Sequence, residues 1–153
     1  MTNIRYREVI ESDIPKMAAI RSKNWGAKEY WQNRIEAYLR CELHPQQALI
    51  PRIIYIAAES ERVVGFIAGH LTRRFDCNGE LQWIDTDSKY RRVGIAKDLF
   101  KLLASWFAER NALCICVNSD PDNLIARQFY RKNGAIDLNK YWMVWRNIKE
   151  IPG

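Results

Sequence analysis

The sequence predicts a mixed α/β fold, in which a central sheet contains an antiparallel meander and one parallel pair of strands. Apolar runs in the middle of the chain are separated by short polar turns such as SER and DCNG, which is typical of strands joined by tight connections. A long stretch after them carries apolar residues at helical spacing. Because this helix connects two strands, and a strand–helix–strand crossover makes its strands parallel, we expect a parallel pair beside the meander.

The first third of the chain predicts one strand followed by two helices. Residues 3–10 alternate in polarity, as a strand does. Ser12 or Asp13 can cap the helix that follows, and Pro15 suits its first turn. Residues 27–40 place apolar side chains at helical spacing and predict a second helix, which the stretch HPQQALIP ends.

The rest of the chain predicts the meander and then alternating helices and strands. The meander consists of RIIYIAAE (52–59), RVVGFIAGHLTRR (62–74) and ELQWIDT (80–86). The long helix continues from Ile95, and a later helix stops at Gly134, a residue type that often ends helices. The predicted order is therefore β-α-α-β-β-β-α-β-α-β-β, with the last three strands in ALCICVN, AIDL and YWMVWRNI.

Composition and charge limit the class of protein. The chain has 153 residues, of which 48% are hydrophobic and 27% charged, as in an ordinary globular domain. The N-terminus lacks the apolar segment of a secretory signal, and no apolar run is long enough to span a membrane, so we expect a cytoplasmic protein. The cysteine spacing fits neither a disulfide framework nor a zinc site, and we expect no metal. The net charge of +6 favours an anionic partner, whether nucleic acid, anionic membrane or polyphosphate.

The start of the long helix carries residues that do not favour a helix. Arg91 and Arg92 add positive charge at an end that already carries about half a unit of it. Gly94 costs roughly 1 kcal/mol relative to alanine in a helix. Open N–H groups, a glycine that allows close approach and arginines together suit a bound pyrophosphate. On these residues alone, an exposed basic turn with an incidental glycine is an equal alternative.

Two motifs connect this turn to a known family. The turn fits the pattern Gln/Arg-x-x-Gly-x-Gly/Ala, and NLIARQFYRKNGA further along fits N-x-x-A-x-x-x-Y-x-K-x-G. With both motifs in this order, the sequence resembles the GNAT superfamily of acetyl-CoA-dependent N-acetyltransferases. The resemblance covers residues 60–148 well and the N-terminal third by element order. It implies a GNAT-like fold in a single N-acetyltransferase domain, residues 1–153.

The resemblance also implies where acetyl-CoA binds. The main chain of Ile84 and Thr86 would pair with the pantetheine arm as an added strand does. Asn123 resembles the asparagine that hydrogen-bonds the cofactor arm, with a plain helix N-cap as the alternative. The implied cofactor-binding residues are Ile84, Thr86, Arg91, Arg92, Val93, Gly94, Ile95, Ala96 and Asn123.

Two residues are the implied catalytic groups. Tyr130 resembles the tyrosine near the thioester sulfur, where a phenol can protonate the leaving thiolate; the alternative is a core aromatic beside Phe129. Glu80 lies at the position of the base glutamate in the histone-acetylating branch of the family, and the alternative is an exposed glutamate with a water chain as base. Asp85 has the opposite parity on the same strand, so both carboxylates can face one side only if the strand contains a bulge.

The predicted function is transfer of the acetyl group of acetyl-CoA to a primary amine of a small molecule or protein. A basic nucleic-acid-binding protein is less favoured because the aromatic signature of an RNA-binding sheet is missing. An acyl-CoA-binding regulator without turnover is the third class. The expected partners are acetyl-CoA and an amine acceptor, without a membrane, and homodimerisation is left open. Aromatic residues of the first helices either line the acceptor pocket or, as we favour for most, pack in the core: Trp25, Tyr30, Trp31 and Tyr38.

Overall fold

The computed structural model describes residues 3–91 and 93–152, and it confirms the predicted fold class and element order. The strands are β1 (Ile4–Glu8), β2 (Ala48–Glu59), β3 (Arg62–Thr72), β4 (Gly79–Thr86), β5 (Ile115–Asn118), β6 (Ile136–Asp137) and β7 (Trp142–Trp145). The helices are α1 (Ile14–Ser22), α2 (Lys28–Leu39), α3 (Ile95–Glu109) and α4 (Leu124–Lys132). Short 3-10 turns complete the chain, including η2 (Arg74–Asp76) and η3 (Ser88–Tyr90) on either side of β4.

The strands form one sheet in the order β1-β2-β3-β4-β5-β7-β6. Strands β2, β3 and β4 are the expected antiparallel meander, and β4 and β5 are the expected parallel pair. The other neighbouring pairs among the described strands are antiparallel. The predicted mixed sheet is therefore confirmed.

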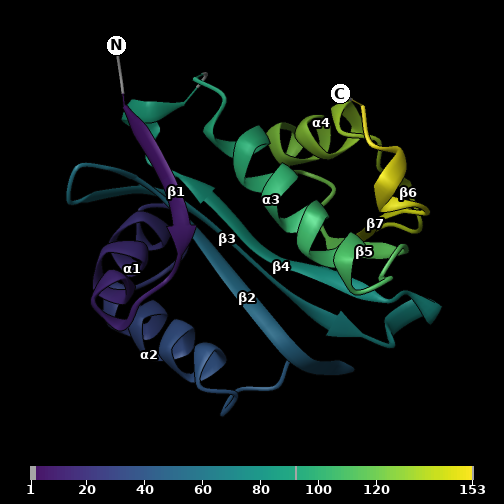
Figure 1. Ribbon diagram of the computed structural model, residues 1–153, viewed down its shortest axis with the longest axis horizontal. Coiled ribbons are helices and arrows are strands. Elements are labelled where there is room, and N and C mark those ends of the chain that lie inside the picture. Colours follow the sequence, from purple (N-terminus) through teal and green to yellow (C-terminus); the bar gives the residue numbers. More distant parts are fainter. Residues whose placement is uncertain (1–2, 92, 153) are drawn as a thin grey trace.

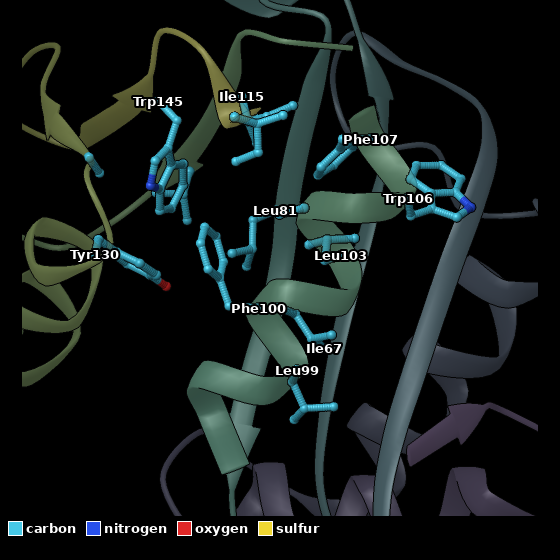
Figure 2. Packing of buried hydrophobic residues seen from close by; sticks show 14 of the residues in the cluster. Ile67, Leu81, Leu99, Phe100, Leu103, Trp106, Phe107, Ile115, Tyr130 and Trp145 are labelled. Carbon is cyan, nitrogen blue, oxygen red and sulfur yellow. The ribbon is translucent and has the colours of Figure 1, made fainter. Parts of the chain in front are cut away.

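Helices cover both faces of the sheet, with α1 and α2 on one face and α3 and α4 on the other (Figure 1). On the α3 face, Leu99, Phe100, Leu103 and Phe107 form the buried stripe that the helical spacing predicts (Figure 2). On the opposite face, α1 and α2 bury Met17, Ile35 and Tyr38 against residues of β2, β3 and β4. Each face thus has its own apolar core, and the sheet separates them.

Two local predictions need correction. Asp13 directly precedes α1, but its side chain does not cap the helix. A 3-10 turn already runs into α1 at this point, so the Asp13 carboxylate accepts hydrogen bonds from the Ile10 N–H and the Arg7 guanidinium instead. Strand β2 begins at Ala48, earlier than predicted, because a register shift between Ala48 and Arg52 lets the strand continue past Pro51.

The described residues also bear on membrane and metal binding. No helix within residues 3–91 or 93–152 is long and apolar enough to cross a membrane. The same residues contain no group of three histidine, cysteine or acidic side chains that could hold a metal ion. Cys77, Cys114 and Cys116 are free thiols that lie together beside Val144.

Gly79 marks a close approach between the sheet and α3. A Cβ atom at this position would collide with the Phe107 ring and lie 2.8 Å from Cδ1 of Ile115. Gly79→Ala should therefore lower the free energy of unfolding by about 1–3 kcal/mol, the usual range for overpacking. Combined with Phe107→Leu, it should cost less than the sum of the two single changes, because leucine vacates the colliding ring. Denaturant unfolding of the four proteins measures this, and strict additivity would contradict it.

Candidate active site

Strands β4 and β5 separate part-way along their length. Their parallel register joins Gly79, Glu80 and Leu81 to the first residues of β5 and goes no further among the described residues. Strand β4 nevertheless continues to Thr86, paired with β3 on its other side. Its edge from Gln82 to Thr86 thus faces a gap between the strands, where main-chain N–H and C=O groups can pair with an extended ligand.

A β-bulge lies where the gap opens. The pairing with β3 shifts between Ala68–Trp83 and Gly69–Leu81, which leaves Gln82 as an extra residue in β4. As a result, Leu81 packs on the α3 face whereas Trp83 packs on the α1–α2 face. The bulge therefore brings Glu80, Trp83 and Asp85 to the same face, which strand parity alone would not allow.

Glu80 is buried rather than exposed at the strand end. Its side chain is 6% exposed, and Oε1 lies 3.2 Å from Nε of Arg74 and 3.6 Å from Nε2 of His70. His70 faces Glu80 directly across the β3–β4 ladder and contacts the Tyr38 hydroxyl through Nδ1 at 2.8 Å. The Arg74 guanidinium compensates the buried carboxylate, which would otherwise carry a large desolvation cost.

Asp85 forms a second buried ion pair on the same face. Its Oδ2 lies 3.4 Å from Nη1 of Arg21, and the two side chains are only 10% and 15% exposed. The Arg21 guanidinium also lies over the rings of Trp31 and Trp25, at 4.6 Å and 5.5 Å from their centroids. Burial raises the pKa of Asp85, although the charge of Arg21 offsets part of the rise.

Tyr130 combines a buried ring with a hydroxyl that lacks a hydrogen-bond partner among the described residues. Its side chain extends from α4 toward Phe100 of α3 (Figure 2), and its ring meets Trp145 edge to face. Burial raises its pKa to about 12, with opposing contributions from the charges of Arg21 and Asp85. The phenol therefore stays protonated at neutral pH and lies within the field of the charges on β4 and α1.

The Arg91–Ala96 turn has the geometry of an open helix start. Gly94 immediately precedes α3 with φ of +84°, a left-handed conformation that favours glycine, and no side chain caps the helix. The first helical N–H groups, those of Ile95 and Ala96, therefore point out beyond the helix start. Val93 and Arg91 are exposed. The charge of Arg91, like that of Arg21, offsets part of the rise in the pKa of Asp85. Arg92 lies outside the described residues.

Asn123 occupies the helix N-cap position that the sequence offered as the alternative. Its Oδ1 accepts a hydrogen bond from the Ala126 N–H at 3.2 Å, which leaves the amide N–H groups to donate elsewhere. Nearby, Arg127 is buried and donates to main-chain oxygens of Ser119 and Asp120, which holds the segment between β5 and α4 in place. The predicted alternative, a helix N-cap, is therefore present, and it leaves the Asn123 side-chain N–H groups available just before α4.

Two buried polar atoms border the same gap without a partner among the described residues. They are Oε1 of Gln82, at the bulge, and Oγ of Ser119, directly after β5. Buried polar atoms almost always have hydrogen-bond partners, so water or a polar ligand would satisfy these two. The gap thus offers a strand edge, an open helix start and unsatisfied polar atoms in one region.

A family model supplies the deciding comparison. The model of the acetyltransferase (GNAT) family matches residues 17–135. The chain belongs to the GNAT acetyltransferase family. Its cofactor class is therefore acetyl-CoA, as the sequence predicted. Comparison with curated proteins gives no match.

Solved structures agree on the GNAT fold. A GNAT-family acetyltransferase from Staphylococcus aureus superposes with a TM-score of 0.73 at 18% identity, covering 95% of this chain and 99% of that one. A ribosomal-protein-alanine N-acetyltransferase from Brucella melitensis gives 0.69 at 18% identity, with 92% and 98% covered. The PaiA N-acetyltransferase from Thermoplasma acidophilum, in complex with coenzyme A, gives 0.67 at 17% identity, with 94% and 98% covered. At these identities the similarity shows the fold.

The aromatic residues in and between α1 and α2 divide between core and surface. Trp31 and Tyr38 are buried with Trp83, as expected for core packing. Trp25 and Tyr30 are exposed. We did not single out the Arg21–Asp85 pair or His70 from the sequence, although an arginine directly after the apolar run MAAI and a histidine in an apolar strand are visible signals.

The buried phenol of Tyr130 predicts a pH dependence of stability. Its folded pKa of about 12 exceeds the ordinary value of 10.0, so the unfolded chain loses this proton first as pH rises. The stability it contributes is complete below about pH 10 and falls as pH rises through about 12. Tyr130→Phe should therefore lose less unfolding free energy than the wild type between about pH 9 and about pH 11. Urea unfolding at both pH values measures this, and an equal loss would show that the phenol is solvated.

Proposed function

We propose that this chain transfers the acetyl group of acetyl-CoA to a primary amine of a small molecule or protein. The observation that carries the proposal is the free edge of β4, which runs from the bulge at Gln82 toward the open helix start at Gly94, with Tyr130 beside it. Family membership supports acyl transfer. N-acetylation is supported by N-acetyltransferases among the similar structures, including those from Brucella melitensis and Thermoplasma acidophilum.

The chain offers matching groups along the length of acetyl-CoA. The main chain of Ile84 and Thr86 lies on the free edge of β4 and would pair with the amides of the pantetheine arm. The N–H groups at the start of α3 would bind the pyrophosphate, and the exposed Arg91 would add charge-assisted hydrogen bonds. Asn123 would donate its amide N–H to the cofactor arm while its oxygen keeps the helix cap.

Tyr130 is the proposed acid. The sulfur of coenzyme A leaves as a thiolate, and the protonated phenol of Tyr130 would give it a proton. The phenol is protonated at neutral pH, as a proton donor must be, although burial raises its pKa and so makes it a weaker acid. The hydroxyl, which has no hydrogen-bond partner among the described residues, would be free to turn toward the sulfur, whereas the ring stays packed against Trp145.

Glu80 is the proposed base. An ammonium group must lose a proton before it can attack the acetyl carbon, and a carboxylate takes that proton directly or through water. Glu80 belongs to the part of β4 that pairs with β5, directly before Leu81, the last paired residue. The Arg74 guanidinium donates a hydrogen bond to its carboxylate. Asp85 shares the same face, so it is the alternative base, although its carboxylate is already committed to Arg21.

An acetyl-CoA turnover assay over a panel of primary amines tests the proposal, with thiol release as the readout. Amine-dependent thiol release supports it. Coenzyme A binding without turnover of any amine would instead support a regulator. Tight, salt-dependent binding of nucleic acid without detectable coenzyme A binding would overturn the proposal.

The turn at Gly94 can be tested with an isosteric pair of variants. A Cβ at Gly94 would meet no atom within 4 Å, so a side chain there projects into open space beside the helix start. Gly94→Asp should bind acetyl-CoA at least about tenfold more weakly than Gly94→Asn, about 1.4 kcal/mol, because only aspartate repels the pyrophosphate. Both residues tolerate the left-handed backbone comparably, so strain cancels in the comparison. Equal affinities by calorimetry would place the pyrophosphate elsewhere.

Removal of the Tyr130 hydroxyl tests the acid. Tyr130→Phe should lower kcat by about 10²-fold, within the usual range for general-acid catalysis, while acetyl-CoA affinity changes little because the ring remains. Steady-state kinetics at several pH values gives the comparison, and Tyr55→Phe on β2 is the control for loss of a half-buried hydroxyl elsewhere. A Tyr130→Phe protein with wild-type kcat at every pH would assign Tyr130 to the core.

A further inference from the structure

A row of polar residues crosses four strands on the face covered by α2. The strand registers pair Arg52 with His70, His70 with Glu80, and Glu80 with Cys116. Residues at facing positions place their side chains on one face, with Cβ atoms about 4.5–5.5 Å apart. His70 is completely buried in this row. The backbone ladder itself therefore holds an imidazole against the proposed base.

The surroundings of His70 favour one tautomer of its ring. Nδ1 lies 2.8 Å from the Tyr38 hydroxyl. The Tyr38 hydroxyl has no other hydrogen-bond acceptor among the described residues, so its proton is used only if it donates to Nδ1. The imidazole proton must then sit on Nε2, which lies 3.6 Å from Oε1 of Glu80 and has no other partner among the described residues.

We infer that His70 is a positioning residue for Glu80, whose Nε2–H orients the carboxylate and stabilises its ionised form, with Tyr38 holding the imidazole in that tautomer. This inference rests on the proposed function, because Glu80 is the base only there. The contact needs an approach of a few tenths of an ångström to become a hydrogen bond. A hydrogen bond to Glu80 would also give the buried Nε2–H of His70 the partner that it otherwise lacks among the described residues.

The other polar groups around Glu80 have different contacts from that proposed for His70. Arg74, from η2, also contacts Oε1 of Glu80 and is its second donor. Cys116, from β5, stays a neutral thiol, because its contact with Cys77 and its burial raise its pKa. Arg52, from β2, lies over the Tyr38 ring at 4.8 Å, donates to the main-chain oxygens of Tyr38 and Leu43 and contacts His44. Loss of the Nε2–H should therefore make the buried carboxylate harder to ionise.

Two amide substitutions separate the two nitrogens of the ring. In His70→Gln the side-chain amide reaches the place of Nε2 and can still donate to Glu80. In His70→Asn the shorter amide reaches the place of Nδ1 and can contact only Tyr38. The acid limb of the pH–rate profile should stay in place in His70→Gln and move up by about one pH unit in His70→Asn, a tenfold lower rate on that limb.

A purely structural role predicts a different outcome. Both variants would then lose stability, and both acid limbs would coincide with that of the wild type. That result would overturn the inference, as would a shift of equal size in both variants. Thermal unfolding of both variants confirms that each is folded at the temperature of the assay.

A spectroscopic measurement tests the contact between His70 and Glu80 independently of enzyme activity. The chain contains only two histidines, so His44→Gln leaves His70 alone in the nitrogen NMR spectrum. We expect a neutral Nε2–H tautomer, which Tyr38→Phe should release and Glu80→Gln should perturb. A Nδ1–H tautomer, or a spectrum unaffected by Glu80→Gln, would overturn the inference. Absence of wild-type turnover with every amine would overturn the proposed function instead, and the tautomer would still show whether the contact exists.

Discussion

The bulge at Gln82 is the constraint on which the rest of the site depends. One extra residue in β4 changes which face each later side chain occupies, so that Trp83 and Asp85 join Glu80 on the α1–α2 face. It also coincides with the end of pairing between β4 and β5. Without the bulge, β4 could stay paired to β5 and the gap would close. The opening of the sheet and the gathering of its carboxylates therefore have one common cause.

The charges gathered on this face are expensive to bury. Replacing a buried ion pair with apolar side chains is often neutral or stabilising, so pairs such as Arg21–Asp85 and Arg74–Glu80 are weak evidence for stability. Perturbed and paired ionisable groups cluster at functional sites for the same reason. In these two pairs both side chains are 17% exposed or less, whereas the buried carboxylates of Asp13 and Asp87 pair with arginines that are 43% and 52% exposed. This distribution supports a chemical use for the pairs.

Periodicity predicted most of the fold but not the details of the site. Helical spacing in α3 and the turn residues of the meander were enough for the element order, because both depend on local sequence. The motif at Arg91–Ala96 located the open helix start, since a glycine and two arginines in this part of the sequence conflict with helix stability. The bulge was not predicted, because both faces of β4 are covered: apolar residues occupy both parities, and the phase change that an extra residue causes does not show. The partners of Glu80 and Asp85 followed from that bulge and from the packing of α1 and α2, which depend on contacts between distant parts of the chain.

In the proposed reaction, the gap lets groups from opposite faces of the sheet act at one place. Tyr130 belongs to α4, yet its ionisation responds to Arg21 and Asp85, which lie on the α1 side. An intact sheet would place a layer of backbone between them, and the strand edge would be occupied. In the proposed reaction the amine loses a proton while the sulfur gains one, and the two events occur on opposite sides of the acetyl carbon. A sheet that opens between β4 and β5 suits this division, because it presents a carboxylate from one face and a phenol from the other to the same bond.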